Sequence, residues 1–128
     1  MAEPADIIRH LWERTQARDW AAVGELLAED VVVEWPVSGE RILGRDHYVR
    51  VNAEYPEGWT IHVLRIVASG TEVVSEVEVH HETMGLHRAA SFWTVRDGRI
   101  VSGREYWTEP GSDPSPEWRA PYVERVSD

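Results

Sequence analysis

The first part of the chain has the apolar spacing of amphipathic helices. Residues 4–18 begin with Pro4, which suits the first position of a helix. The inward face of this helix is predicted to consist of Ile8, Leu11, Trp12 and Thr15. Asp19 is a typical N-cap, so a second helix is predicted through residue 28. Its inward positions are Trp20, Val23 and Leu27.

The rest of the chain reads mostly as β-strands. An early strand is predicted at 31–36, closed by Pro36, and a short helix at 45–54 has Tyr48, Val51 and Asn52 near one side. Runs rich in β-branched and aromatic residues then predict strands at 59–68, 71–81, 86–96 and 99–108. Asp97-Gly98 between the last two is a strong hairpin signal. Helices followed by an antiparallel meander indicate the α+β class.

The chain length predicts a single domain over residues 1–128. Its core is predicted at 5–108, followed by an irregular, proline-rich tail at 109–128 with at most one helical turn near 116–119. Trp118 in this tail is interpreted as a dimer or sheet contact.

Successive side chains of a strand point to opposite faces of the sheet. This alternation, which we call parity, assigns each predicted strand residue to the inner or the outer face. In 71–81, one face would carry Glu72, Glu76 and Glu78, and burying three carboxylates is costly. The opposite set therefore faces inward: Thr71, Val73, Ser75, Val77, Val79 and His81. In 86–96, the parity that buries Ala89, Ser91 and Trp93 also turns His87 inward.

The last strand offers two sets that the apolar pattern alone does not separate. Arg104 favours placing Ile100, Ser102, Arg104 and Tyr106 outward, where Arg104 could pair with Glu76 or Glu78. Val101, Gly103, Glu105 and Trp107 then face inward. An inward carboxylate beside a tryptophan makes Glu105 the most informative residue of the chain.

Composition excludes several classes of function. A net charge of −10 argues against nucleic acid and anionic membrane surfaces as partners. The absence of cysteine excludes thiolate catalysis and cysteine metal sites. The first 15 residues lack the segments of a signal peptide, so we expect a cytoplasmic protein.

Three stretches, "LLAEDVVVEWP", "GRDHYVRVN" and "FWTVRDGRIVSGREYW", resemble the SnoaL-like group of the nuclear transport factor 2-like superfamily. The resemblance covers residues 5–108. It implies a cone, in which a curved antiparallel sheet wraps around the N-terminal helices and encloses a deep apolar pocket. Members include steroid isomerases, polyketide cyclases, epoxide hydrolases and dehydratases, so the fold alone does not fix the activity.

Residue-by-residue comparison with two members tests their chemistry. The base of ketosteroid isomerase matches Trp35 in "VEWP", which turns Trp35 toward the pocket and Glu34 away from it. The other isomerase positions fall near Leu11, Asn52 and Ser91, so steroid isomerase activity is disfavoured. The closing-strand carboxylate of the epoxide hydrolases matches Glu105, but its two partners match Val77 and Val79.

The predicted site therefore combines parity with the resemblance. Glu105 and His81 are the candidate catalytic residues, with Glu105 as the proton-transfer group and His81 as its orienter or second acid/base. The ligand-binding residues are predicted to be Trp12, Trp35, Asn52, His87, Ser91 and Trp107. Each has a structural alternative: a hydrogen-bonded carboxylate, a half-buried strand-end histidine, or tryptophans that only pack.

Two functions follow from this site. The first is a cofactor-free acid–base enzyme acting on a small apolar or cyclic substrate by isomerisation, dehydration, cyclisation or epoxide opening. The alternative is a domain that binds a small ligand without turnover. Two histidines plus Glu105 could form a metal site, but their spacing is not diagnostic, so neither a metal nor a cofactor is predicted. A homodimer through the outer sheet face is expected, with Phe92, Ile100 and Tyr106 as an apolar stripe among charges.

Overall fold

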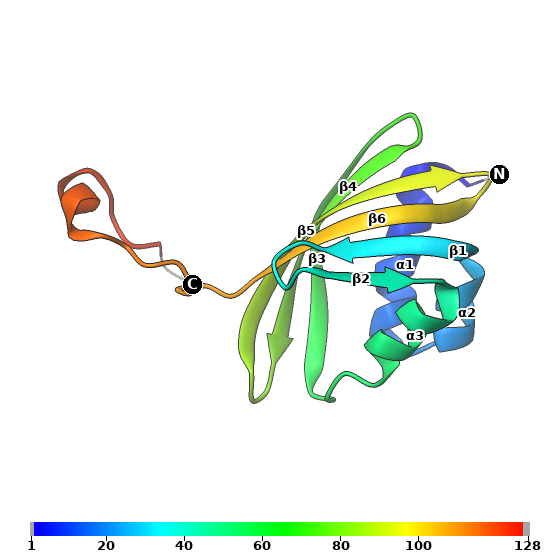
Figure 1. The fold of residues 1–128 in the computed structure, drawn as a ribbon, viewed down its shortest axis with the longest axis horizontal. Helices are drawn as coiled ribbons and strands as arrows, with labels where there is room; N and C mark the ends of the chain where they lie inside the picture. The colour runs from blue at the N-terminus through cyan, green and yellow to red at the C-terminus, as the bar shows by residue number, and fades with distance from the viewer. Residues whose placement is uncertain (1, 127–128) are drawn as a thin grey trace.

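A six-stranded sheet wraps around three helices in the computed structural model, which describes residues 2–126 (Figure 1). The helices are α1 (Pro4–Gln16), α2 (Trp20–Glu25) and α3 (Arg45–Ala53). The strands are β1 (Leu27–Trp35), β2 (Glu40–Leu43), β3 (Trp59–Ser69), β4 (Glu72–His81), β5 (Gly85–Arg96) and β6 (Arg99–Thr108). This arrangement confirms the α+β class and the curved sheet around N-terminal helices.

The strand order is β2-β1-β6-β5-β4-β3. Neighbouring strands are antiparallel except for β1 and β6, which run parallel. Asp97 and Gly98 join β5 to β6 with φ angles of 51° and 77°, and two positive φ angles are what a two-residue type I′ hairpin requires. The predicted meander β3–β6 is thus confirmed.

Two elements differ from the prediction. The second helix ends at Glu25 rather than at residue 28, because Leu27 and its successors pair with β6 and extend β1. β2 was not predicted: its four residues follow the turn after Pro36 and hydrogen-bond to β1, from Trp35 opposite Glu40 to Val32 opposite Leu43. In both places a tertiary pairing overrides a weak local pattern.

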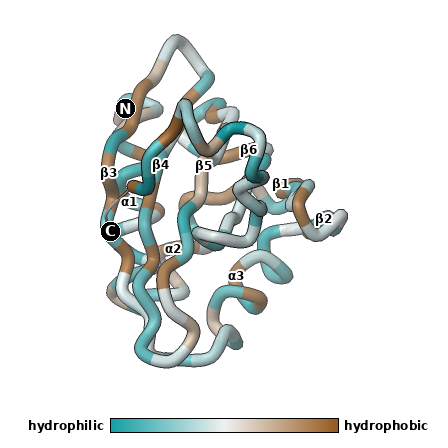
Figure 2. The backbone as a smooth tube through the Cα atoms, turned by 90° about the vertical axis from the view of Figure 1, so that its left-hand side faces the viewer, coloured by the Kyte–Doolittle hydropathy of each residue, from teal (hydrophilic) through white to brown (hydrophobic). Residues whose placement is uncertain are grey.

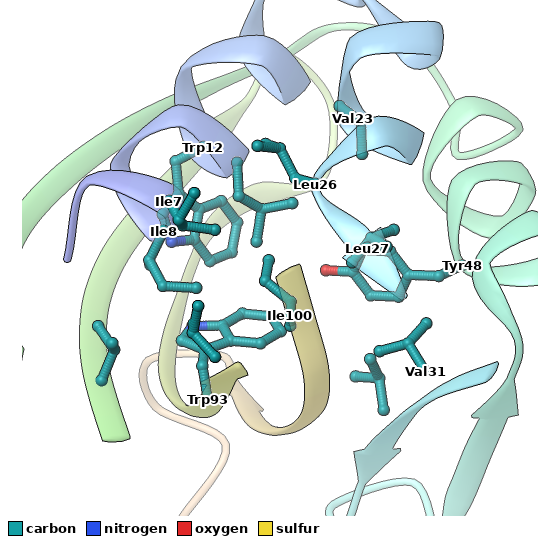
Figure 3. Packing of buried hydrophobic residues seen from close by; sticks show 14 of the residues in the cluster. Ile7, Ile8, Trp12, Val23, Leu26, Leu27, Val31, Tyr48, Trp93 and Ile100 are labelled. Atoms are coloured by element: carbon teal, nitrogen blue, oxygen red, sulfur yellow. The ribbon is translucent and has the colours of Figure 1, made fainter. Parts of the chain in front are cut away.

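The inner face of the sheet and the helices enclose one apolar core. Figure 3 shows Trp93 and Ile100 under α1, and Tyr48 beside Leu27 and Val31. Along β3 and β4, hydrophobic and hydrophilic positions are interleaved (Figure 2), which is the pattern of a sheet with one buried face. On β4, Val73, Ser75, Val77, Val79 and His81 are buried as predicted, whereas Thr71 precedes the strand and is exposed.

The predicted parity of β6 fails at its beginning. Ile100 is buried and Val101 only half-buried, the reverse of the prediction. The register shifts from Val95 opposite Ile100 to Thr94 opposite Ser102, so Val101 is an extra, bulged residue. A bulge reverses the alternation on one side of it, which is why Gly103 and Glu105 still face inward as predicted.

The charged pairs of the outer face also differ from the prediction. Arg104 lies 3.5 Å from Glu34 on β1, not beside Glu76 or Glu78. Those two carboxylates pair instead with Arg65 and Arg88, at 3.1 Å and 2.9 Å. The described helices include none that is long and apolar enough to cross a membrane.

Candidate active site

A pocket of about 400 Å³ opens between α1, α3 and the inner face of the sheet. Most of its wall is apolar or aromatic, with a few polar groups, which is the usual character of a small-molecule site. The lining residues are Trp12, Thr15, Trp35, Val37, Ser38, Glu40, Val51, Asn52, Tyr55, Trp59, Ile61, Val79, His81, His87, Glu105 and Trp107. All the predicted site residues except Ser91 are in this wall.

Glu105 is the buried carboxylate of the pocket, with only 1% of its surface exposed. Its Oε2 accepts hydrogen bonds from Trp35 Nε1 at 3.0 Å and from the Tyr48 hydroxyl at 3.3 Å. Its Oε1 accepts one from the Ser91 hydroxyl at 3.1 Å, and Trp107 is a further side-chain donor. Four donors from β1, α3, β5 and β6 therefore converge on one carboxyl group.

The local sequence explains this convergence. Ser91 lies directly opposite Glu105 in the β5–β6 register, so their side chains share one face. Trp35 ends β1, where parity turns it inward and Glu34 outward, as predicted. Ser91 is fully buried behind the carboxyl group, so its position is that of a support for Glu105 rather than of pocket wall.

Burial raises the pKa of Glu105, because the charged form loses its hydration. The hydrogen bonds from Trp35, Ser91, Tyr48 and Trp107 act in the opposite direction, since they stabilise the carboxylate. Burial is the larger effect, so Glu105 holds its proton to a higher pH than an ordinary glutamate. A carboxyl group whose pKa is raised in this way is suited to give and take protons.

Tyr48 belongs to this site but was not predicted there. It is buried in α3, and burial raises the pKa of its hydroxyl well above the ordinary value, with the neighbouring charge of Glu105 as the second cause. It therefore stays protonated and acts as a hydrogen-bond donor to Glu105. The available signal was the spacing of Tyr48 and Asn52, four residues apart on one helical face; the Asn52 amide donates to the Tyr48 carbonyl at 2.8 Å.

His81 lies in the pocket wall but is not hydrogen-bonded to Glu105. Its Nε2 lies 3.0 Å from the Pro56 carbonyl, and its Nδ1 accepts from the backbone N–H groups of Thr83 and Met84 at 3.1 Å and 3.3 Å. These contacts hold the ring with Nδ1 as an acceptor and Nε2 facing a carbonyl oxygen. The predicted Glu105–His81 pair is therefore absent from the described residues.

The register of the strands explains the separation. Glu105 is opposite Ser91, and Ser91 is opposite Ser75 on β4. His81 is six residues further along β4, which is roughly 20 Å at the rise of a strand. His87 is half-buried in the wall at the same end as His81, and no group of three metal-binding side chains comes together within residues 2–126.

Trp12 of the pocket wall is oriented by contacts with Ser75 and with two other indoles. Ser75 Oγ accepts from Trp12 Nε1 at 3.1 Å and from Trp93 Nε1 at 2.9 Å. Trp12 also meets Trp107 edge to face, with ring centroids 6.5 Å apart. Gly103 makes room for this arrangement, because a Cβ there would lie 2.5 Å from the Trp93 ring. Parity predicted that Ser75 is buried, but not that it orients two indoles.

The charge of the wall limits the ligands that fit. Among the described residues, the lining has two carboxylates, Glu40 and Glu105, and no arginine. Apart from the histidines His81 and His87, an anionic ligand would meet no basic side chain of the described wall in a largely apolar space. The arrangement is therefore suited to a neutral or cationic small molecule.

The comparisons with known proteins agree with this architecture. A family model described as "SnoaL-like domain" matches residues 8–103. A crystal structure of a "putative ketosteroid isomerase" from Kribbella flavida is 32% identical, covers 98% of this chain and 90% of its own, and has a TM-score of 0.87. No protein with a curated description matches the chain.

Two more distant structures share the fold alone. An NTF-2 like protein of unknown function from Burkholderia xenovorans is 24% identical, with coverages of 97% and 95% and a TM-score of 0.79. An LEH-like epoxide hydrolase of M. tuberculosis is 23% identical, covers 82% of both chains and has a TM-score of 0.70.

Proposed function

The chain belongs to the SnoaL-like domain family, and from this premise we propose that it is a cofactor-free acid–base enzyme acting on a small, apolar or cyclic substrate. The observation that carries the proposal is Glu105: a buried carboxyl group in the wall of an aromatic pocket, with a raised pKa. Perturbed carboxyl groups in clefts are typical of proton-transfer sites.

In this proposal, the Glu105 carboxylate takes a proton from a carbon or oxygen of the substrate and becomes a carboxylic acid. It then returns the proton to another substrate atom or to a leaving oxygen. Trp35 and Trp107 are half-buried in the pocket wall, whereas Tyr48 and Ser91 are fully buried. The two indole N–H groups are therefore the donors that a substrate displaces, while Tyr48 and Ser91 keep the carboxyl group in place.

The pocket lacks residues that two known reactions of this fold require, and this narrows the possible reaction types. Trp35 occupies the position of the steroid isomerase base, so proton transfer by that route is disfavoured. Val77 and Val79 occupy the positions of two polar residues of the epoxide hydrolase site, so Glu105 would have to act without them. Isomerisation, dehydration and cyclisation require only one proton-transfer group and a shaped pocket, and they agree best with these residues.

A generic substrate tests the proposal before the natural one is known. 5-Nitrobenzisoxazole is flat and neutral, and a base that takes its ring C–H proton breaks the N–O bond to release a coloured cyanophenolate. We expect Glu105→Gln to lower kcat/KM for this probe by about a hundredfold or more while the fold is kept. Glu40→Gln is the matched control, because Glu40 lines the same pocket but is exposed. Equal loss in both variants, or none in Glu105→Gln, would exclude Glu105 as the base.

A second function, binding without turnover, is favoured by one specific observation. A carboxylate has about four lone-pair positions, and Glu105 has four side-chain donors. In a pure binding domain these donors would stay in place and Glu105 would only anchor the wall. Glu105→Gln would then leave ligand affinity nearly unchanged, and neither protein would turn the probe over.

We further propose a homodimer through the outer sheet face. Phe92 is 49% exposed there and meets Tyr106 edge to face, at 6.1 Å between ring centroids. Ile100 does not belong to this face, because the bulge in β6 buries it. Light scattering at micromolar protein concentration would test the dimer, and a monomer would exclude it.

A further inference from the structure

The C-terminal arm, residues 109–126, lies apart from the body of the molecule. It leaves the sheet at the end of β6 and carries a short 3₁₀ segment, η1 (Glu117–Tyr122), well away from the strands (Figure 1). The hydrogen bonds described for it are internal: Ser112 N–H to the Glu109 carbonyl, and Arg119 to the carbonyls of Pro116 and Pro114.

This arm exposes large apolar side chains. Trp118 is 74% exposed and Tyr122 is 82% exposed, and Val123 and Val126 are exposed beside them. The predicted sheet contact of Trp118 is therefore not made within its own chain. Clustered exposed aromatic residues on a segment without a core are typical of a surface that a partner covers.

The arm has an aligned counterpart in a related crystal structure. Residues 1–108 make up 108 of 128 residues, about 84% of the chain. The match to the Kribbella flavida protein covers 98% of this chain. It therefore extends beyond residue 108 into the arm, so a chain that is 32% identical has a segment that aligns with the arm.

The outer face of the sheet offers a site for this arm. A groove of about 420 Å³ runs across β1, β6, β5 and β4 on the side opposite the pocket. We call it the outer-face groove; its outward side chains are Val32, Glu34, Ser102, Arg104, Phe92, Thr94, Val74 and Glu72. These positions are neighbours in the register, with Val32 opposite Ser102, and Phe92 opposite both Val74 and Arg104.

The chemistry of the groove matches that of the arm. Phe92 and Val74 are exposed apolar side chains that an indole ring would cover. Glu34 in the groove is ion-paired with Arg104 and Arg41. Within residues 2–126, the Glu72 carboxylate accepts only from the Thr94 hydroxyl, and the residue after Trp118 is the cation Arg119. Aromatic and arginine side chains are the residue types most enriched at interface centres.

The arm is long enough to reach this groove on a second copy. Arg104 in the groove is four residues from Thr108, about 13 Å along the strand. Trp118 is ten positions beyond Thr108, a segment that spans at most about 33–36 Å when extended. Facing sheets lie about 10 Å apart, so the arm can cross such an interface.

From these observations we propose that the arm of one copy docks Trp118 into the outer-face groove of a second copy, with Arg119 toward Glu72. Each copy gives one arm and receives one, so the contact closes with two-fold symmetry. This inference rests on the proposed dimer, and it assigns to the arm the role of fastening that dimer.

The test uses the absence of cysteine from the chain. Glu117→Cys and a mass-tagged Ser102→Cys are co-expressed and oxidised, so that a disulfide between the two variants reports the arm of one copy on the groove of another. We expect this cross-link, and we expect added Trp118→Ala to remove it. Glu117→Cys with Ser38→Cys at the pocket mouth is the control pair, which should not cross-link.

Sedimentation of the full chain supplies the second readout. Trp118→Ala should raise the dimer dissociation constant at least tenfold, and Leu43→Ala, which removes an exposed apolar side chain from β2, should not change it. A dimer unaffected by Trp118→Ala, or a cross-link to the Ser38→Cys position instead, would overturn the docking while leaving the enzyme proposal intact. A wild-type monomer would overturn the dimer and the docking together.

Discussion

Glu105 and His81 both face the inside of the sheet, yet they are held in different ways. Glu105 is surrounded by side-chain donors from four elements, and all of them point at its carboxyl oxygens. His81 sits at the end of β4, where its ring joins backbone groups of two loops. The surroundings of Glu105 shift the pKa of its carboxyl group, whereas His81 stabilises two loops through hydrogen bonds to their backbone. An inward position alone therefore does not make a residue catalytic.

The largest expected effect is the loss of the Glu105 side chain. Glu105→Ala should lower the free energy of unfolding by about 2–4 kcal/mol, because it leaves buried donors unpaired and opens a cavity. Urea denaturation measures this, with Glu40→Ala as the exposed control, expected within about 0.5 kcal/mol of wild type. If Glu105→Ala also changed the free energy of unfolding by only about 0.5 kcal/mol, this would contradict the hydrogen bonds described for the Glu105 carboxyl group.

His81→Ala should have a smaller effect, and on stability alone. Losing its hydrogen bonds to Pro56, Thr83 and Met84 should cost about 1–2 kcal/mol. Turnover of 5-nitrobenzisoxazole should stay within a factor of two or so, apart from any unfolded fraction. His80→Ala, an exposed neighbour, serves as control. A loss of turnover as large as that in Glu105→Gln would restore His81 as a catalytic partner.

Tyr48→Phe should move the pKa of Glu105 rather than remove activity. The Tyr48 hydroxyl stabilises the charged form of Glu105, so its removal should raise that pKa further. Because a general base acts when it is deprotonated, the rising limb of kcat/KM against pH should shift to higher pH. Tyr55→Phe is the control, since the Tyr55 hydroxyl bonds to Met84 and not to Glu105. A shift to lower pH would contradict the assignment of Tyr48 as donor.

The smallest expected effect concerns metals, and it is no effect. His81, His87 and Glu105 form no common cluster, so a chelator such as EDTA should change neither the melting temperature nor the turnover of the probe. Elemental analysis of the purified protein provides an independent check. Stoichiometric zinc or iron that is lost in His81→Ala would contradict this expectation.

Sequence reasoning reached the parts of the site that depend on alternation. Successive side chains of a strand point to opposite faces. Once one face is known, this alternation predicts that Trp35 faces inward and Glu34 outward, and that Glu105 faces inward and Arg104 outward. Alternation assigns a residue to a face of the sheet but does not give its position along the strand. Glu105 and His81 were therefore predicted to form a pair, although the strand register places them far apart. Alternation also cannot predict a β-bulge. The bulge at Val101 is why Ile100 was predicted to face outward and Val101 inward, whereas Ile100 is buried.

The remaining errors have a different origin. Tyr48 reaches Glu105 across the space between α3 and β6. Its spacing from Asn52 indicates a shared helical face, but the contact with Glu105 depends on how the helix packs against the sheet. β2 and the shortened α2 depend on pairing with distant strands. These features depend on tertiary contacts. In short segments with weak intrinsic propensities, such contacts decide the secondary structure.

The central claim is that Glu105 is a proton-transfer group with a raised pKa, and direct titration tests it best. Carbon-13 labelling of glutamate side chains, with Glu105→Gln to assign the signal, would give the pKa of Glu105 in the folded protein. The account predicts a midpoint above that of an ordinary glutamate and coincident with the rising limb of kcat/KM for 5-nitrobenzisoxazole. A midpoint at or below the ordinary value, or a pH–rate profile that does not follow it, would contradict the account.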